Sequence, residues 1–212
     1  MRKFILSVLA IILALGLAGT GALAYFSDTE TSMGNTYTAG TFDLKVADPN
    51  QDGAGYDGVS QTWVMSNMIP GTSTVSSKVW FRNAGSIPAN HLEIAVSNTV
   101  IDGPGPESDT EEGTTDMARV IEITSMKYTP PAGTGPVIDC LAWLTDKNGN
   151  GIKDLDDLQE LGIDSLPPPK ISPFITTELE ITLKFHSSAD NDYQGDTFIS
   201  TFTFTLNQDS SQ

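Results

Sequence analysis

Residues 198–206 read Phe-Ile-Ser-Thr-Phe-Thr-Phe-Thr-Leu, and this stretch gives the clearest indication of the fold class. In an extended chain, successive side chains point to opposite faces. Phe198, Phe202, Phe204 and Leu206 therefore share one face, while the opposite face carries Ile199 and three threonines. An apolar face backed by a polar one is typical of an antiparallel strand that covers a core on one side and meets water on the other.

The same period of two recurs along the rest of the chain. No regular alternation of strands with long helices is visible, which argues against a parallel α/β sheet. We therefore predict an all-β fold: an antiparallel β-sandwich, jelly-roll-like or immunoglobulin-like, formed by one domain over residues 39–212. The other predicted strands are 42–46, 75–82, 92–97 and 179–186, with shorter ones at 61–65 and 120–128.

Composition and charge exclude several classes of function. The 212 residues include 27 acidic and 11 basic side chains, for a net charge of −16, so we predict no nucleic-acid partner. Cys140 is the single cysteine, which rules out an intrachain disulfide and is typical of a small buried side chain. His91 and His186 belong to no zinc-peptidase motif, and we expect both at the surface. Since no other catalytic motif appears, we predict that the protein is not an enzyme.

The N-terminus is typical of an export signal. Arg2 and Lys3 precede an uncharged apolar stretch, and Ala22-Leu23-Ala24 forms a small-x-small cleavage site. We predict a signal peptide over residues 1–24, cut between Ala24 and Tyr25, and a secreted protein that meets the membrane only during export. A retained membrane anchor remains an alternative, because the apolar stretch is long enough to cross a bilayer.

Residues 146–157 read Asp-Lys-Asn-Gly-Asn-Gly-Ile-Lys-Asp-Leu-Asp-Asp and follow the spacing of an EF-hand calcium loop. Alternate oxygen-bearing side chains converge in such a loop, the glycine at position 6 makes the sharp turn, and the residue after it offers its carbonyl. The last position holds Asp in place of Glu, as in the loops of dockerin-type modules, which this one resembles. A short helix is expected to follow and to end at Gly162. The predicted structural calcium ligands are Asp146, Asn148, Asn150, Ile152 (carbonyl), Asp154 and Asp157.

Two further acidic stretches are weaker candidates. Residues 48–58 contain Asp48, Asn50, Asp52 and Asp57, which match the opening of a second cation loop, although Pro49 interrupts it. Otherwise this stretch is a solvated connection between strands. Residues 102–116 carry six acids and no base, and we interpret them as a solvated surface loop.

The junction after the signal resembles a known family. Residues 22–31 read Ala-Leu-Ala-Tyr-Phe-Ser-Asp-Thr-Glu-Thr, and residues 35–44 read Asn-Thr-Tyr-Thr-Ala-Gly-Thr-Phe-Asp-Leu. Both stretches resemble the TasA/camelysin family, and the resemblance covers residues 1–46. It implies a secreted jelly-roll protein, processed by a SipW-type signal peptidase and assembled into pilus-like fibres of the cell surface or biofilm matrix.

The resemblance also implies how such fibres assemble. In donor-strand complementation, the mature N-terminus of one subunit completes the sheet of the next, which gives a head-to-tail homopolymer. Here the donor would be residues 25–38, with Tyr25, Phe26, Met33 and Tyr37 as its large side chains. Neighbouring filaments in bundles, or matrix components, would be further partners. Two alternatives remain open: a monomeric secreted module that binds a partner through calcium, and a camelysin-like metallopeptidase.

Overall fold

The computed structural model describes residues 40–47, 63, 65, 67–101, 117–172, 177–190, 193 and 195–209. Contacts divide the chain between Ala39 and Gly40, and all described residues belong to the second part. The predicted signal, the donor segment 25–38, the second cation loop at 48–58 and the acidic loop 102–116 lie outside the described residues.

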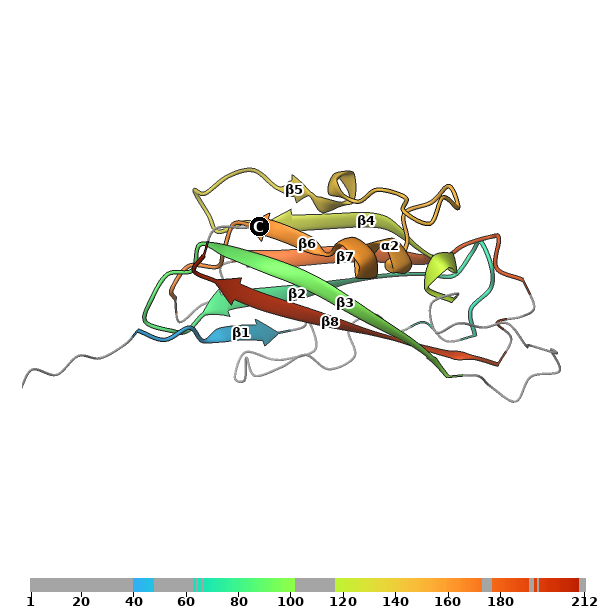
Figure 1. The fold of residues 1–212 in the computed structure, drawn as a ribbon, viewed down its shortest axis with the longest axis horizontal. Coiled ribbons are helices and arrows are strands. Elements are labelled where there is room, and N and C mark those ends of the chain that lie inside the picture. Colours follow the sequence, from blue (N-terminus) through green and yellow to red (C-terminus); the bar gives the residue numbers. More distant parts are fainter. Residues whose placement is uncertain are drawn as a thin grey trace, which may run out of the picture. The chain divides into compact units, whose positions relative to one another are not determined.

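Two antiparallel sheets form the described fold, which confirms the predicted all-β sandwich (Figure 1). The larger sheet has the strand order β1-β2-β7-β4-β5, and the smaller has the order β6-β3-β8. The helical elements are short: the 3₁₀ helices η1 and η2 and the α-helix α2. The bounds are β1 Leu44–Ala47, β2 Thr74–Asn83, β3 His91–Ile101, η1 Met117–Val120, β4 Ile121–Thr129, β5 Ile138–Asp139, η2 Cys140–Trp143, α2 Leu155–Leu161, β6 Ile163–Leu166, β7 Thr177–Phe185 and β8 Thr197–Asn207.

The predicted alternation sets the faces of the long strands. In β7 every second residue is buried, and in β3 the even-numbered residues from Leu92 to Asn98 are buried. The even-numbered side chains of β8 likewise point inward, and its exposed positions are the odd-numbered ones. The aliphatic and aromatic side chains of both inner faces form one core.

The strand order is that of a jelly roll with one position open. An eight-stranded jelly roll has its first and last strands as neighbours in one sheet. Here β2-β7-β4-β5 and β6-β3-β8 follow that pattern, but β1 pairs with β2 in the larger sheet. Within the described part of the chain, the place beside β8 therefore has no strand.

The chain just before β1 is held by the loop after β2. The amide of Ala84 donates to the carbonyl of Asp43 at 2.7 Å, and that of Ser86 donates to the carbonyl of Thr41 at 2.9 Å. Gly40 lies so close to Ile87 that a Cβ on it would stand 1.9 Å from a methyl carbon. The Gly-Thr-Phe-Asp-Leu stretch at 40–44 is thus held against the loop after β2.

Some sequence predictions were incomplete. Trp63 and Met65 belong to no strand, so the predicted strand at 61–65 is wrong at these positions. The short strands β5 and β6 were not predicted, because two and four residues are too few to show a period. The predicted helix after residue 154 is confirmed as α2, and Gly162 ends it with φ of 62°.

Candidate functional site

The long outer edge of β8 is the first candidate site. Three of the four edge strands in the described sheets are short: β1 and β6 have four residues each and β5 has two. Lys45 in β1 and a bulge in β6 further discourage pairing with another chain. By contrast, β8 has eleven residues, no charged side chain and an unbroken register with β3. Every second residue of such an edge directs its unpaired N–H and C=O groups outward.

Beneath this edge, the inner face is apolar and only partly covered. Phe202 and Phe204 are half-buried, whereas the core side chains of β7 are fully buried. The indole of Trp63 packs on Phe202 with ring centroids 5.0 Å apart, and its Nε1 donates to the carbonyl of Ile181 at 2.8 Å. The other partly buried side chains against the core include Leu44, Val46, Met65, Met68 and Phe198.

The loop 146–157 is the second candidate site, and Asp146 organises it. One carboxylate oxygen of Asp146 accepts from the amides of Gly149 at 2.7 Å and Asn150 at 3.1 Å, and the other accepts from Gly151 at 2.8 Å. Gly149 and Gly151 have φ of 73° and 90°, which only glycine adopts easily. The predicted sharp turn therefore has its physical cause in these residues.

Asn148, Asn150 and Asp154 converge at one point. The side-chain amides of Asn148 and Asn150 donate to the same oxygen of Asp154, at 3.1 and 2.7 Å. Burial raises the pKa of Asp154. The hydrogen bonds from Asp157, Asn148 and Asn150 act to lower the pKa but do not cancel the effect of burial. A cation at this point would pair with the buried carboxylate, and both amides would have to turn their oxygens toward it.

Asp157 plays a different part in the structure. Its two oxygens accept from the amides of Lys147 at 2.7 Å and Asp154 at 3.2 Å, and Asp154 in turn caps the helix by accepting from the amide of Asp157. This reciprocal arrangement is a capping box, and it positions α2. The carboxylates of Asp146, Asp154 and Asp157 do not gather within 4.8 Å of one another in the described loop. Calcium binding here stays a prediction.

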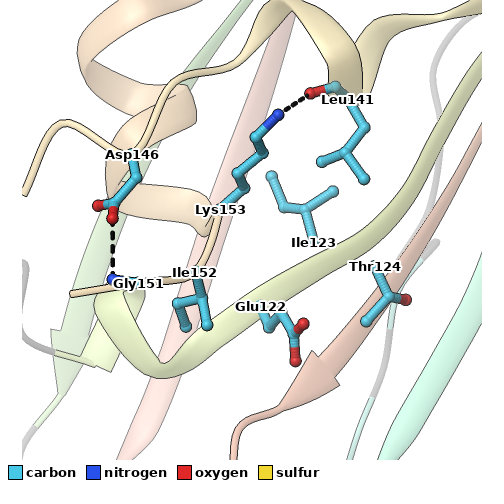
Figure 2. Close-up of a pocket in the computed structure, with 8 residues that line it drawn as sticks. All are labelled: Glu122, Ile123, Thr124, Leu141, Asp146, Gly151, Ile152 and Lys153. Atoms are coloured by element: carbon cyan, nitrogen blue, oxygen red, sulfur yellow. Dashed lines mark hydrogen bonds between the residues drawn. The ribbon is translucent and has the colours of Figure 1, made fainter. Parts of the chain in front are cut away.

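A shallow pocket lies beside the loop (Figure 2). Asp146, Gly151 and Ile152 line it from the loop side, and the bulged start of β4 lines it from the other, with Thr124 as the extra residue. Lys153 and Leu141 also line the pocket, and the ammonium of Lys153 donates to the carbonyl of Leu141 at 2.8 Å. The backbone of the loop is joined to β4 through the amide of Ile123, which donates to the carbonyl of Lys153 at 2.8 Å.

A third group of side chains was missed by sequence reasoning. His91 is only 5% exposed, so the expectation that it lies at the surface is wrong. Its Nε2 lies 2.8 Å from Oε1 of Glu93 and 3.4 Å from Oδ1 of Asp164. The hydrogen bond to Glu93 raises the pKa of His91, burial opposes this, and the charges of Asp164 and Asp209 add to the rise. The His-x-Glu spacing in a strand was the available signal, but Asp164 is brought in by the fold alone.

Comparison with protein families identifies the chain. It matches the model of the camelysin metallo-endopeptidase family over residues 1–212. The chain belongs to the camelysin family. This confirms the TasA/camelysin resemblance seen at its N-terminus. A search of curated proteins found no match for this camelysin-family chain.

The family name implies a metal, so side chains that could hold one are of interest among the described residues. Zinc peptidases commonly hold their ion with two histidines and a carboxylate. His186 bonds to Ser188 instead and joins no cluster, so His91, Glu93 and Asp164 are the group in the described residues that brings ligand atoms within 4.8 Å. These three side chains suit a divalent ion with one nitrogen and two oxygen ligands, and they do not make a two-histidine peptidase centre.

None of the helices in the described part of this camelysin-family chain has the length and apolar content needed to span a bilayer.

Proposed function

We propose that this chain is a secreted structural subunit of an extracellular filament, of the pilus or biofilm-matrix kind, in which residues 25–38 of one copy pair with β8 of the next. The carrying observation is the uncharged, eleven-residue edge of β8, along which the described residues place no strand, beside a partly covered apolar face. Adding an extended segment to a free edge satisfies the outward backbone groups and buries apolar area at the same time.

The point of attachment favours pairing between copies. The loop after β2 holds residues 41–43 and leads into His91, which pairs with Asn207 at the end of β8. Residues 25–38 laid along their own β8 would thus run toward this same end, parallel to β8. Every strand pair of the described sheets is antiparallel. A segment from another copy is free to enter in the antiparallel direction, which leads to a chain of subunits rather than a closed monomer.

The length and pattern of the donor suit the edge. At about 3.3 Å per residue, residues 25–38 span about 46 Å when extended, against about 36 Å for β8. Tyr25, Met33 and Tyr37 are separated by even numbers of residues, so they share one face of an extended segment. That face would cover Phe198, Phe202 and Phe204, while Phe26 would point the other way.

Calcium is proposed as a structural ligand of the 146–157 loop within this subunit. The convergence of Asn148 and Asn150 on buried Asp154 supports a cation there. The ion would stabilise a surface excursion that ends in α2. The helix is joined to the core through Asn98, whose side chain donates to the carbonyl of Leu155 at 2.9 Å.

A peptide experiment tests the subunit function. The chain lacking residues 1–38 is mixed with a synthetic peptide of residues 25–38, and a scrambled peptide of the same composition is the control. We expect the mature chain to form filaments in electron micrographs and the truncated chain to stay monomeric. The native peptide should raise the melting temperature of the truncated chain, and the scrambled one should not. Filaments formed by the truncated chain would refute the donor assignment.

A metallopeptidase is the second candidate function, favoured by the family name and by the His91 cluster. Cleavage of an unfolded protein substrate by the purified chain, blocked by a metal chelator and absent in His91→Ala, would establish it. We expect no such cleavage. A monomeric calcium-dependent binding module is the remaining alternative, and it would be favoured if the mature chain never polymerises with or without calcium.

A further inference from the structure

The outward face of the smaller sheet carries a polar cluster where its three strands meet. His91 and Glu93 are two residues apart in β3 and therefore share a face. Inward-facing residues of β3 have even numbers, so this shared face is the outer one. Asn207, the direct partner of His91 across the β3–β8 ladder, lies on the same face.

A bulge in β6 brings Asp164 to this polar cluster. Leu92 pairs with Leu166 and Ile94 pairs with Ile163, so that Asp164 and Ser165 together oppose Glu93. Ser165 has φ of 64°, an uncommon value for a residue with a side chain. Bulges often redirect a side chain toward a site. Here the bulge turns Asp164 to the outer face, where its Oδ1 lies 3.4 Å from Nε2 of His91.

We propose that Nε2 of His91, Oε1 of Glu93 and Oδ1 of Asp164 form a binding site for one divalent transition-metal ion, such as Zn²⁺ or Mn²⁺, which ties β3 to β6. The three atoms lie within 4.8 Å of one another, close enough to surround a single ion. Imidazole nitrogen together with carboxylate oxygens suits such ions, whereas calcium takes oxygen ligands.

Two carboxylates face one imidazole at the site: Oε1 of Glu93 lies 2.8 Å and Oδ1 of Asp164 lies 3.4 Å from Nε2 of His91. With a neutral imidazole, the two carboxylates carry a charge of about −2, which a divalent ion would offset. In the described part of the chain, no lysine or arginine forms an ion pair with Glu93 or Asp164.

The site is open to an entering ion, and a neighbouring side chain holds one of its carboxylates in place. The side chains of Glu93 and Asp164 are 39% and 37% exposed, while that of His91 is 6% exposed, so an ion would enter from the carboxylate side and keep water ligands there. The side-chain amide of Asn207 donates to Oε1 of Glu93 at 2.5 Å and orients it, as outer-shell groups do at metal sites. An ion held here would also stiffen the end of β8.

Calorimetric titration of the purified chain with Zn²⁺ and with Mn²⁺, in excess calcium, tests the site. We expect one equivalent of either ion to bind and to raise the melting temperature. Glu93→Gln and Asp164→Asn should each weaken the affinity at least tenfold, and His91→Asn should abolish binding. His186→Asn and Asp154→Asn are matched controls that should bind as the original chain does, which also separates this site from the calcium loop. Equal binding by the three site variants would overturn the proposal, as would no binding by the original chain; in the latter case the cluster is an ion-pair network only.

A second measurement does not depend on the variants folding. Paramagnetic Mn²⁺ at a low molar ratio should broaden the NMR signals of the His91 ring and leave those of His186 sharp. Equal broadening of both rings, or none, would contradict the site.

Discussion

Phe81 of β2 and Phe204 of β8 meet edge to face across the interior, with ring centroids 4.8 Å apart and planes inclined by 66°. This contact places β8 over β2. Since β1 lies beyond β2 in the larger sheet, no described strand of the smaller sheet covers β1. The half-buried side chains Leu44 and Val46 of β1 and Phe202 of β8 flank the place opposite β1 that no described strand fills.

Phe81→Ala should lower the free energy of unfolding by about 3–5 kcal/mol, because a fully buried ring is lost and a cavity remains. Urea denaturation of the original and variant chains measures this difference. Ile199→Ala, at a position of β8 that is 46% exposed, is the control and should change stability by less than about 0.5 kcal/mol.

Phe198→Ser should weaken binding of the 25–38 peptide to the truncated chain about tenfold, since less apolar area is buried when the peptide covers β8. The matched control is Ile199→Ser, which changes the opposite face of the same strand. Fluorescence titration with a labelled peptide gives both affinities. Equal losses in the two variants would show that the inner face of β8 is not the acceptor.

Asp154→Asn should remove the rise in melting temperature that calcium gives. Asparagine caps a helix as well as aspartate does, so α2 should persist. The folded-state pKa of Asp154 is raised, so ionising this group costs more in the folded chain than in the unfolded one. The resulting loss of stability grows as the pH rises from the ordinary value of 3.8 to the folded-state value and is constant above it. In a calcium chelator the variant should therefore gain stability relative to the original chain at pH 7 and lose that advantage near pH 3.

Scanning calorimetry across pH, with and without calcium, measures both effects. Asp43→Asn is the control, since Asp43 is an exposed partner of Lys45 outside the loop. A calcium response that survives in Asp154→Asn would end the loop assignment.

Glu178→Gln should reduce the acid sensitivity of the sandwich. Burial opposes ionisation of Glu178, but hydrogen bonds from Lys78 at 2.8 Å and Trp80 at 2.9 Å outweigh it and lower the pKa of Glu178. A lowered folded-state pKa gives stability that is present above the ordinary value of 4.5 and is lost as the pH falls through the folded value. Since the pair is partly exposed, the effect should be about 1 kcal/mol or less. Urea denaturation between pH 3 and pH 7 compares the variant with Glu180→Gln.

The thiol of Cys140 should be unreactive in the folded chain. Burial, together with the charge of Asp139, raises the pKa of Cys140 to about 12, and the residue has no exposed surface. A thiol reagent at pH 8 should label the protein only in denaturant. Rapid labelling under native conditions would show that the segment from β5 to η2 opens readily.

The faces of the strands and the local turns follow from the amino-acid sequence alone. A period of two shows which side chains share a face, so the inward sets of β3, β7 and β8 were predicted correctly. The glycines and oxygen-bearing side chains of 146–157 act within a few residues, and the turn, the cap and α2 follow from them. The N-terminal motif likewise gave the family.

Which strands are neighbours depends on long-range contacts that the sequence pattern does not reveal. Pairing depends on contacts between residues far apart in the chain, and alternation carries no information about them. Among the described strands, the edge of β8 has no neighbour because β1 pairs with β2, a choice that four residues of sequence cannot show. The His91 cluster depends on a bulge in β6 and on the register of β3 with β8. The residues that these features bring next to His91 bury it, although it lies on the outward face of its strand.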